Sequence, residues 1–259
     1  MADFIDYIIH GDDMQLVEIE LDPGEGVRAE AGAMMYMEND IEMQTNTGGG
    51  VFKGLKRMFT GESFFITNFV HRGSGKGHVA FGAPYPGKVV PIDLVAFNGT
   101  FICQKDSFLC AANGIEIEIE LTKKLGTGLF GGEGFILQRL EGHGMAFIHA
   151  GGALIKRHLQ PGEILKVDTG CIVGFEKTVD YDINFVGGFT NALFGGEGLF
   201  LATLRGPGVV YLQSLPFSRL ADRIMAGARK TGTTKGEQKG FSGIGGNIFG
   251  GFLGGDNNY

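Results

Sequence analysis

The sequence predicts an all-β protein that is built from three copies of one unit and carries one helix near its C-terminus. Three observations predict this class: short apolar runs with strand periodicity, glycine-rich turns between them, and a motif that recurs three times. Glycine accounts for 46 of the 259 residues, and most glycines stand between apolar runs. Tight turns are therefore expected along the whole chain.

The recurring motif places a glutamate after a short Phe-x-Gly turn. The three copies are Met58-Phe-Thr-Gly-Glu62, Leu129-Phe-Gly-Gly-Glu133 and Leu193-Phe-Gly-Gly-Glu197. Each copy is followed by a Gly-x-Gly turn and an apolar run, which begin at Gly75, Gly142 and Gly206. Three matches in the same order are unexpected by chance, so they predict a unit of roughly 65–70 residues.

A second motif supplies the other half of the unit. The run from Pro23-Gly-Glu25 matches the run from Pro161-Gly-Glu163, whereas the middle copy is degenerate and keeps only a segment around Gly99. These matches predict a single β domain over residues 1–235. Its predicted parts are three repeats at about 1–83, 84–152 and 153–216 and a C-terminal helix at 216–230. Residues 231–259 are predicted to form a separate, flexible Gly-rich tail.

Individual strands follow from the spacing of apolar residues. Residues 115–121, 17–21 and 181–185 alternate apolar and polar side chains, which predicts strands with one buried and one exposed face. Residues 135–137 and 209–212 are apolar at every position and are predicted to form inner strands.

Two segments have helical rather than strand periodicity. Residues 51–59 carry apolar side chains at 51, 52, 55, 58 and 59, which predicts a short amphipathic helix. The segment from Pro216 to Met225 also predicts a helix, with an apolar stripe that includes Phe217 and Ile224 and with Ser218 as its N-cap.

Composition excludes several classes of function. The net charge is −7 and the isoelectric point is near 5.4, so we expect no DNA binding and do not expect RNA binding. Three cysteines without a C-x-x-C pair favour a reducing compartment. No apolar run approaches the ~20 residues of a membrane span, and acidic residues stand where a signal peptide has basic ones. We therefore predict a cytoplasmic protein.

Standard catalytic and cofactor motifs are missing from the sequence. The segment Gly126–Gly131 matches G-x-G-x-x-G, but a strand-like run follows it, so a turn cluster is favoured over a dinucleotide site. Ser242 lacks the closing glycine of a nucleophile elbow. The histidines form no metal-binding spacing, although His143 and His149 could still converge in space. We predict that the chain is not an enzyme, with no catalytic residue, metal or cofactor; any binding residues remain unknown.

The repeated glutamates Glu62, Glu133 and Glu197 are the sharpest candidate feature of the sequence. In one interpretation they form a ring of three acids that binds a cation or a basic peptide. In the other, each carboxylate accepts backbone N–H bonds from its own glycine-rich turn. The second interpretation is favoured because the glutamate accompanies its glycines in every copy.

Residues 217–240 are basic, with six Lys or Arg residues against two acids and hence a net charge of +4. Such a segment can lie on anionic lipid or RNA. It can also be a solvated face or pair with the acidic remainder of the chain, and this interpretation is favoured.

The doubled Leu-Phe-Gly-Gly-Glu-Gly motif, the Pro-Gly-Glu runs and the Gly-x-Gly strands resemble the mitochondrial biogenesis family named "altered inheritance of mitochondria, twenty-four" over roughly residues 5–235. The resemblance implies a fold like that of the tryptophan RNA-binding attenuation protein (TRAP-like), in which a short double-stranded β-helix or β-sandwich unit is repeated within one chain. It implies a bacterial-type member with no known catalytic residue or cofactor, and a link to membrane organisation.

The sequence therefore predicts a non-catalytic scaffold or binding protein that acts as a homo-oligomer, with contact to a membrane surface as a further prediction. The alternative is a small-molecule or metal-binding protein with a site between repeats. Ligand, partner, oligomer number and pathway are left open, as is the role of the Gly/Phe-rich C-terminal tail.

Overall fold

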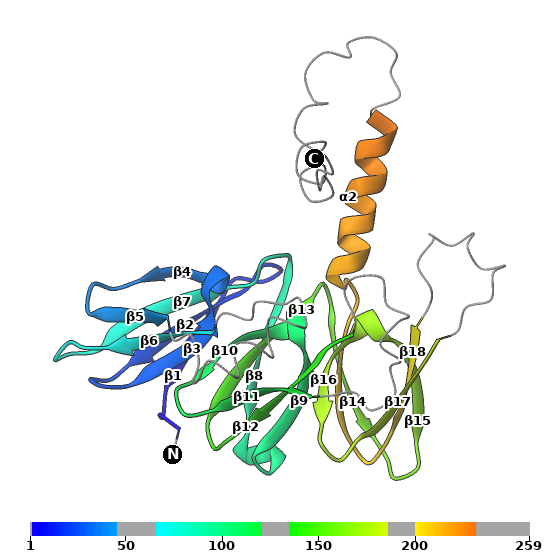
Figure 1. The fold of residues 1–259 in the computed structure, drawn as a ribbon, viewed down its shortest axis with the longest axis horizontal. Helices are drawn as coiled ribbons and strands as arrows, with labels where there is room; N and C mark the ends of the chain where they lie inside the picture. The colour runs from blue at the N-terminus through cyan, green and yellow to red at the C-terminus, as the bar shows by residue number, and fades with distance from the viewer. Residues whose placement is uncertain (1, 46–65, 121–134, 186–199, 232–259) are drawn as a thin grey trace, which may run out of the picture. The chain divides into compact units, whose positions relative to one another are not determined.

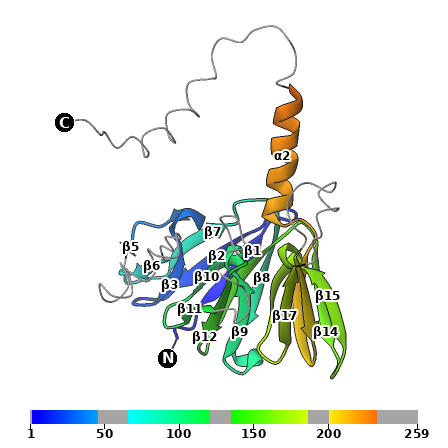
Figure 2. The same cartoon turned by 45° about the vertical axis from the view of Figure 1, so that its right-hand side comes forward.

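The computed structural model describes residues 2–45, 66–120, 135–185 and 200–231 of the chain. These residues form nineteen β-strands and one α-helix, so the predicted all-β class with a C-terminal helix is confirmed. Residues 1–219 form one compact unit and residues 220–259 form a second. Figures 1 and 2 show the sheets of the first unit following one another in chain order, from blue to yellow.

The described residues of the first unit form four antiparallel sheets. The first sheet has the order β1 (Asp6–His10), β2 (Leu16–Leu21), β7 (Gly77–Gly82), β4 (Met34–Met37). The second has the order β5 (Ile41–Thr45), β6 (Ile66–His71), β3 (Gly26–Glu30), β10 (Phe108–Ala112), β13 (Met145–Gly151), β8 (Gly87–Asp93).

The third and fourth sheets continue this series. The third has the order β11 (Glu116–Glu120), β12 (Leu137–Glu141), β9 (Thr100–Gln104), β16 (Ile172–Glu176), β19 (Gly208–Gln213), β14 (Leu154–Leu159). The fourth has the order β15 (Ile164–Asp168), β18 (Phe200–Arg205), β17 (Asp180–Phe185).

The same four antiparallel pairings recur in three successive parts of the chain. The first part has the pairs β2·β7, β4·β7, β3·β6 and β5·β6. The second part has, in the same order, β8·β13, β10·β13, β9·β12 and β11·β12. The third part has β14·β19, β16·β19, β15·β18 and β17·β18. A register shift interrupts the second pair of each set, at Met34/Tyr36, Phe108/Cys110 and Ile172/Gly174. This pairing scheme supports the three-repeat interpretation of the sequence.

Successive parts of the chain are joined by strand pairing. Strand β3 of the first part pairs with β10 of the second, and β9 of the second pairs with β16 of the third. Each joint lies in the middle of a six-stranded sheet, so both partners are interior strands. We call these two joints the first and the second internal junction.

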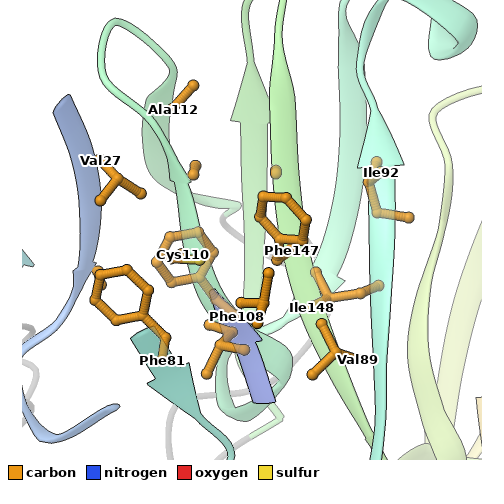
Figure 3. Close-up of a cluster of buried hydrophobic side chains, with 14 of the residues drawn as sticks. Val27, Phe81, Val89, Ile92, Phe108, Cys110, Ala112, Phe147 and Ile148 are labelled. Carbon is orange, nitrogen blue, oxygen red and sulfur yellow. The ribbon is translucent and has the colours of Figure 1, made fainter. Parts of the chain in front are cut away.

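The main core lies between the first two sheets and extends into the third. Figure 3 shows part of it, where Phe81, Phe108 and Phe147 lie among aliphatic side chains such as Val27 and Ile92. A smaller cluster around Phe175 fills the third part of the chain. The five bulkiest of the fully buried side chains are all phenylalanines, so the phenylalanine ring contributes much of the buried apolar surface.

Several strand predictions are confirmed in detail. The alternation over residues 17–21 forms β2, in which Val17, Ile19 and Leu21 are fully buried. Residues 209–212 lie in β19, an inner strand between β16 and β14. Residues 135–137 only reach the start of β12, which begins at Leu137.

The alternation over residues 115–121 does form a strand, β11, but the prediction of one uniformly buried face is wrong. Ile115 is fully buried, Ile117 is half-buried and Ile119 is 44% exposed. Strand β11 lies at the edge of the third sheet and has β12 as its one neighbour among the described residues. Fewer side chains therefore cover its apolar face, and exposure increases from Ile115 to Ile119.

The predicted C-terminal helix is α2 (Phe217–Thr231). Because α2 begins at Phe217, Ser218 lies inside its first turn and does not precede it, so the assignment of Ser218 as the N-cap is wrong. The helix predicted at 51–59 and the tail from residue 232 onward lie outside the described residues.

Candidate functional site

The repeated glutamates Glu62, Glu133 and Glu197 all lie outside the described residues, and so do Gly126–Gly131 and Ser242. Both interpretations of the glutamates therefore stay predictions. Within the part of the chain that the structure describes, no group of three or more His, Cys, Asp or Glu residues could hold a metal ion.

The structure gives His143 and His149 different environments. His143 is exposed in the turn after β12, whereas His149 is buried in β13 and packs edge-on against Tyr85 with ring centroids 4.5 Å apart. Burial lowers the pKa of His149 to about 4, and a weaker interaction of the ring with the backbone of Tyr85 acts in the opposite direction. His149 is therefore a neutral core side chain near pH 7.

The three cysteines are free thiols. Cys103 and Cys110 are fully buried, and burial raises the pKa of Cys103 to about 12 and that of Cys110 well above its usual value. Cys171 is half-buried, and burial also raises its pKa. Since the thiolate is the reactive form, none of the three has the character of a nucleophile at neutral pH.

Exposed apolar side chains are concentrated in the first part of the chain. Between residues 4 and 43 these large side chains are exposed: Phe4, Tyr7, Ile8, Met14, Met35, Tyr36, Met37 and Met43. Three of them are consecutive in β4, where Met35 is 56%, Tyr36 44% and Met37 37% exposed. We did not predict this surface from the sequence, although the run Met34-Met-Tyr-Met37 is a signal of it.

Strand β4 is held firmly on one side only. It pairs with β7, and the carboxylate of Glu38 just beyond it accepts the backbone N–H of His78 at 3.0 Å. The Tyr36 hydroxyl donates a hydrogen bond to Glu18, and this bond raises the pKa of Tyr36. No strand lies on its other side among the described residues, so β4 is an edge strand with apolar side chains.

The last sheet of the first unit has a comparable edge at β15. Strand β15 pairs with β18 on one side and has no strand on the other side within the described ranges. Ile164 is 57% exposed and Lys166 is exposed, while Val167 is buried. Figure 1 shows β4 (blue) and β15 (yellow-green) at opposite ends of the series of sheets.

A pocket of about 290 Å³ lies at the second internal junction. Its lining includes Ile102, Glu120, Arg139, Thr178, Asp180 and Tyr181. The pocket is open, and charged side chains stand beside apolar ones in its lining, in contrast to the enclosed and mostly apolar cavity of most drug-sized ligand sites.

Arg139 lies in this pocket among three carboxylates. Its guanidinium nitrogens are 2.7 Å from Glu118, 3.3 Å from Glu141 and 3.6 Å from Glu120. The hydrogen bond to Glu118, followed by the charges of the other carboxylates, raises the pKa of Arg139. This cation is thus already neutralised by the protein, which leaves little positive charge for an anionic ligand.

At the first internal junction, Arg28 takes the position that Ile102 holds at the second, since the two residues pair with Ala111 and Phe175 at the same register. The Arg28 guanidinium donates to the carbonyl oxygen of Ile115 at 3.1 Å. The two junctions share their backbone pairing but differ in what fills the space beside it.

Helix α2 combines basic residues with exposed apolar ones. Phe217, Ile224 and Met225 are exposed, and Arg219 and Arg223 lie in the same helix. Arg219 forms an ion pair of 2.7 Å with Asp168, so one of the six basic residues of segment 217–240 pairs with the acidic remainder of the chain. Among the described residues, no helix has the length and apolar character needed to cross a membrane.

Comparisons with known proteins converge on one family. The model of the family described as mitochondrial biogenesis AIM24 matches residues 7–215. An uncharacterised protein of Streptococcus pyogenes serotype M6 is 30% identical over 217 residues, which cover 81% of this chain and 85% of that protein. An X-ray crystal structure of another Streptococcus pyogenes protein has a TM-score of 0.70 at 26% identity and covers 86% of this chain and 99% of its own.

Proposed function

This chain belongs to the mitochondrial biogenesis AIM24 family, and we propose that it is a non-catalytic scaffold or binding protein that acts as a homo-oligomer in the cytoplasm. One observation carries the proposal: β4 is an edge strand on which three consecutive large apolar side chains are exposed. Natural proteins usually shorten, charge or cover such edges, because an uncovered apolar edge strand pairs with other chains. Association with further copies provides the cover here.

Sedimentation of the native full-length protein at micromolar concentration tests this proposal. One chain has a mass of 27.7 kDa, and we expect a species of at least twice that mass. A 27.7 kDa monomer over the whole concentration range, together with no partner in affinity capture from its own host, contradicts the scaffold proposal.

Contact with a membrane surface is the second part of the proposal. It is supported by α2, whose exposed Phe217, Ile224 and Met225 lie on the same helix as basic residues, the arrangement of an interfacial helix. Flotation of the full-length protein with vesicles containing anionic lipid at low salt should bring it to the lipid fraction. A variant with Ile224→Ser and Met225→Ser should float much less, whereas Ala228→Ser in the same helix serves as the matched control.

A small-molecule or metal-binding protein remains the alternative, and the pocket at the second internal junction is the observation that favours it. A thermal-shift screen with inorganic phosphate, small carboxylates and small amines, together with elemental analysis of the purified protein, tests it. A shift that Thr178→Trp abolishes, because the indole fills the pocket, supports a ligand site there. No shift and no metal leave the scaffold proposal alone.

A further inference from the structure

We propose that copies of this chain join head to tail, with β4 of one copy pairing antiparallel with β15 of the next. This inference rests on the proposed homo-oligomer and names its interface. It follows from three independent features of the described residues: the strand that each edge lacks, the order of strands in the incomplete sheets, and the burial of equivalent positions.

The internal junctions define the missing neighbours. Strand β4 occupies the place in its part of the chain that β10 and β16 occupy in theirs, and both of these pair with the preceding part, through β3 and β9. Strand β15 occupies the place of β3 and β9, which both pair with the following part. Among the described strands, β4 and β15 therefore lack the neighbour that their counterparts have. The neighbour missing beside β4 is a strand equivalent to β15, and the one missing beside β15 is a strand equivalent to β4.

The order of strands in the sheets gives the same answer. The second sheet runs β5-β6-β3-β10-β13-β8, and the third repeats this order with β11-β12-β9-β16-β19-β14. The fourth sheet, β17-β18-β15, matches the first half of that order, while β4-β7-β2 of the first sheet matches the second half. Joining β15 to the partner's β4 completes a sheet of the same order, with the partner's β1 as one extra strand.

Burial at equivalent positions shows what the missing neighbour covers. The bulge residues Leu109 in β10 and Val173 in β16 are 2% and 0% exposed, whereas their counterpart Met35 in β4 is 56% exposed. Likewise Ala111 and Phe175 are fully buried at the internal junctions, whereas their counterpart Met37 is exposed. The residues of β4 are thus apolar as for an interior strand, yet they remain uncovered in one chain.

The internal junctions also fix the register of the proposed pair. Cys110 and Gly174 lie opposite Ala29 and Cys103, and Ala111 and Phe175 lie opposite Arg28 and Ile102. By the same register, Tyr36 lies opposite Val167 of the partner subunit, and Met37 lies opposite Lys166 of the partner subunit. Because the two surfaces differ, the contact is heterologous, and repetition gives a ring where the rotation closes and a filament where it does not.

Cysteine cross-linking between two singly substituted proteins tests the interface. One protein carries Met37→Cys and the other Lys166→Cys, both in a Cys171→Ser background that leaves two buried native thiols. Residues directly opposite on antiparallel strands have Cα atoms about 4.5–5.5 Å apart, within the range of about 4.4–6.8 Å found across disulfides. Mild oxidation of the mixture should give a covalent dimer with one copy of each protein, and neither protein alone should give one.

A register control uses Ile164→Cys in place of Lys166→Cys. It moves the second thiol two residues along β15, to a diagonal position about 7–8 Å away, so cross-linking with Met37→Cys should fall sharply. Because Met37, Lys166 and Ile164 are all exposed, none of the substitutions should disturb the fold, and thermal melting of each variant checks this.

The outcomes separate this inference from the proposed function. A mixed dimer at the predicted register supports the interface. Equal cross-linking of Met37→Cys with itself, or absence of a mixed dimer from protein that sediments as an oligomer, overturns the β4–β15 pairing and leaves the homo-oligomer in place. Native protein that sediments as a monomer overturns both.

Discussion

Strands β4 and β10 occupy the same place in two successive parts of the chain, but one is covered and the other is not. Both are apolar, and both carry a bulge against the strand beside them, β7 or β13. Strand β10 has β3 on its other side and every one of its side chains is buried, whereas β4 has no such neighbour among the described residues. The apolar composition of a strand and its burial are therefore different properties, because burial also depends on the strands beside it.

Truncating the bulge residue should lower the stability of the protein by very different amounts in the two strands, and this is the largest difference that we expect. Leu109→Ala leaves a cavity in the core and should lower the free energy of unfolding by about 3–4 kcal/mol. Met35→Ala at the equivalent exposed position should lower it by less than about 1 kcal/mol. Urea unfolding followed by circular dichroism, at a protein concentration low enough for the chain to sediment as a monomer, measures both; equal losses would mean that β4 is covered in the same chain.

A pH titration of stability extends the comparison to His149 in β13, beside β10. In the third part of the chain its counterpart is Gln213, which accepts the N–H of Gly151 and donates to the carbonyl of Gly170. Since His149 has a pKa of about 4 when folded and 6.5 as its ordinary value, the unfolded chain binds more protons between these two values. Stability is therefore full above about pH 6.5 and falls as the pH drops toward 4.

One pKa unit corresponds to about 1.4 kcal/mol, so His149 should remove up to about 3 kcal/mol of stability by pH 4. His149→Gln should flatten this part of the stability curve, because the amide does not titrate. His143→Gln, which changes an exposed histidine in the same part of the chain, is the matched control for the substitution itself. Denaturant midpoints measured from pH 7 to pH 4 decide between these results.

Much of the fold could be predicted from periodicity and turns, because these patterns depend on local geometry. The alternation over residues 17–21 gave β2 correctly, and the apolar run over 209–212 gave an inner strand. Strand β11 shows the limit: Ile119 fits the alternation but is exposed, because burial requires a neighbour that spacing does not encode.

The candidate site was less predictable than the fold. Nothing in the run Met34–Met37 tells whether its cover comes from the same chain or from a second copy, so the β4 edge became visible only with the strand order. Arg139 and its carboxylates come together from β11 and β12, which residues 121–136 separate in sequence. The glutamates 62, 133 and 197, which the sequence singled out, lie in the segments that the structure does not describe.

A charged residue in place of Met37 should change the strength of association, and the sign of the charge should decide the direction. Opposite the partner's Lys166, Met37→Glu forms an attractive cross-strand pair and Met37→Lys a repulsive one. The two variants should differ by about 1 kcal/mol in association free energy, or about fivefold in dissociation constant, with Met37→Lys the weaker. Sedimentation equilibrium measures the difference, and Met37→Lys combined with Lys166→Glu should restore association. Indistinguishable dissociation constants would argue against the register.

The smallest effect is expected at Tyr36, where the ring and the hydroxyl have separate roles. Its hydroxyl donates to Glu18 on the same exposed surface, and exposed hydrogen bonds of this kind contribute little to stability. Tyr36→Phe should therefore change the free energy of unfolding by less than about 1 kcal/mol and leave association unchanged, because the ring that meets the partner's Val167 is kept. Tyr36→Ser removes the ring and should weaken association while the fold stays intact. If Tyr36→Phe alone abolished association, association would depend on the Tyr36 hydroxyl and not on apolar cover of β4.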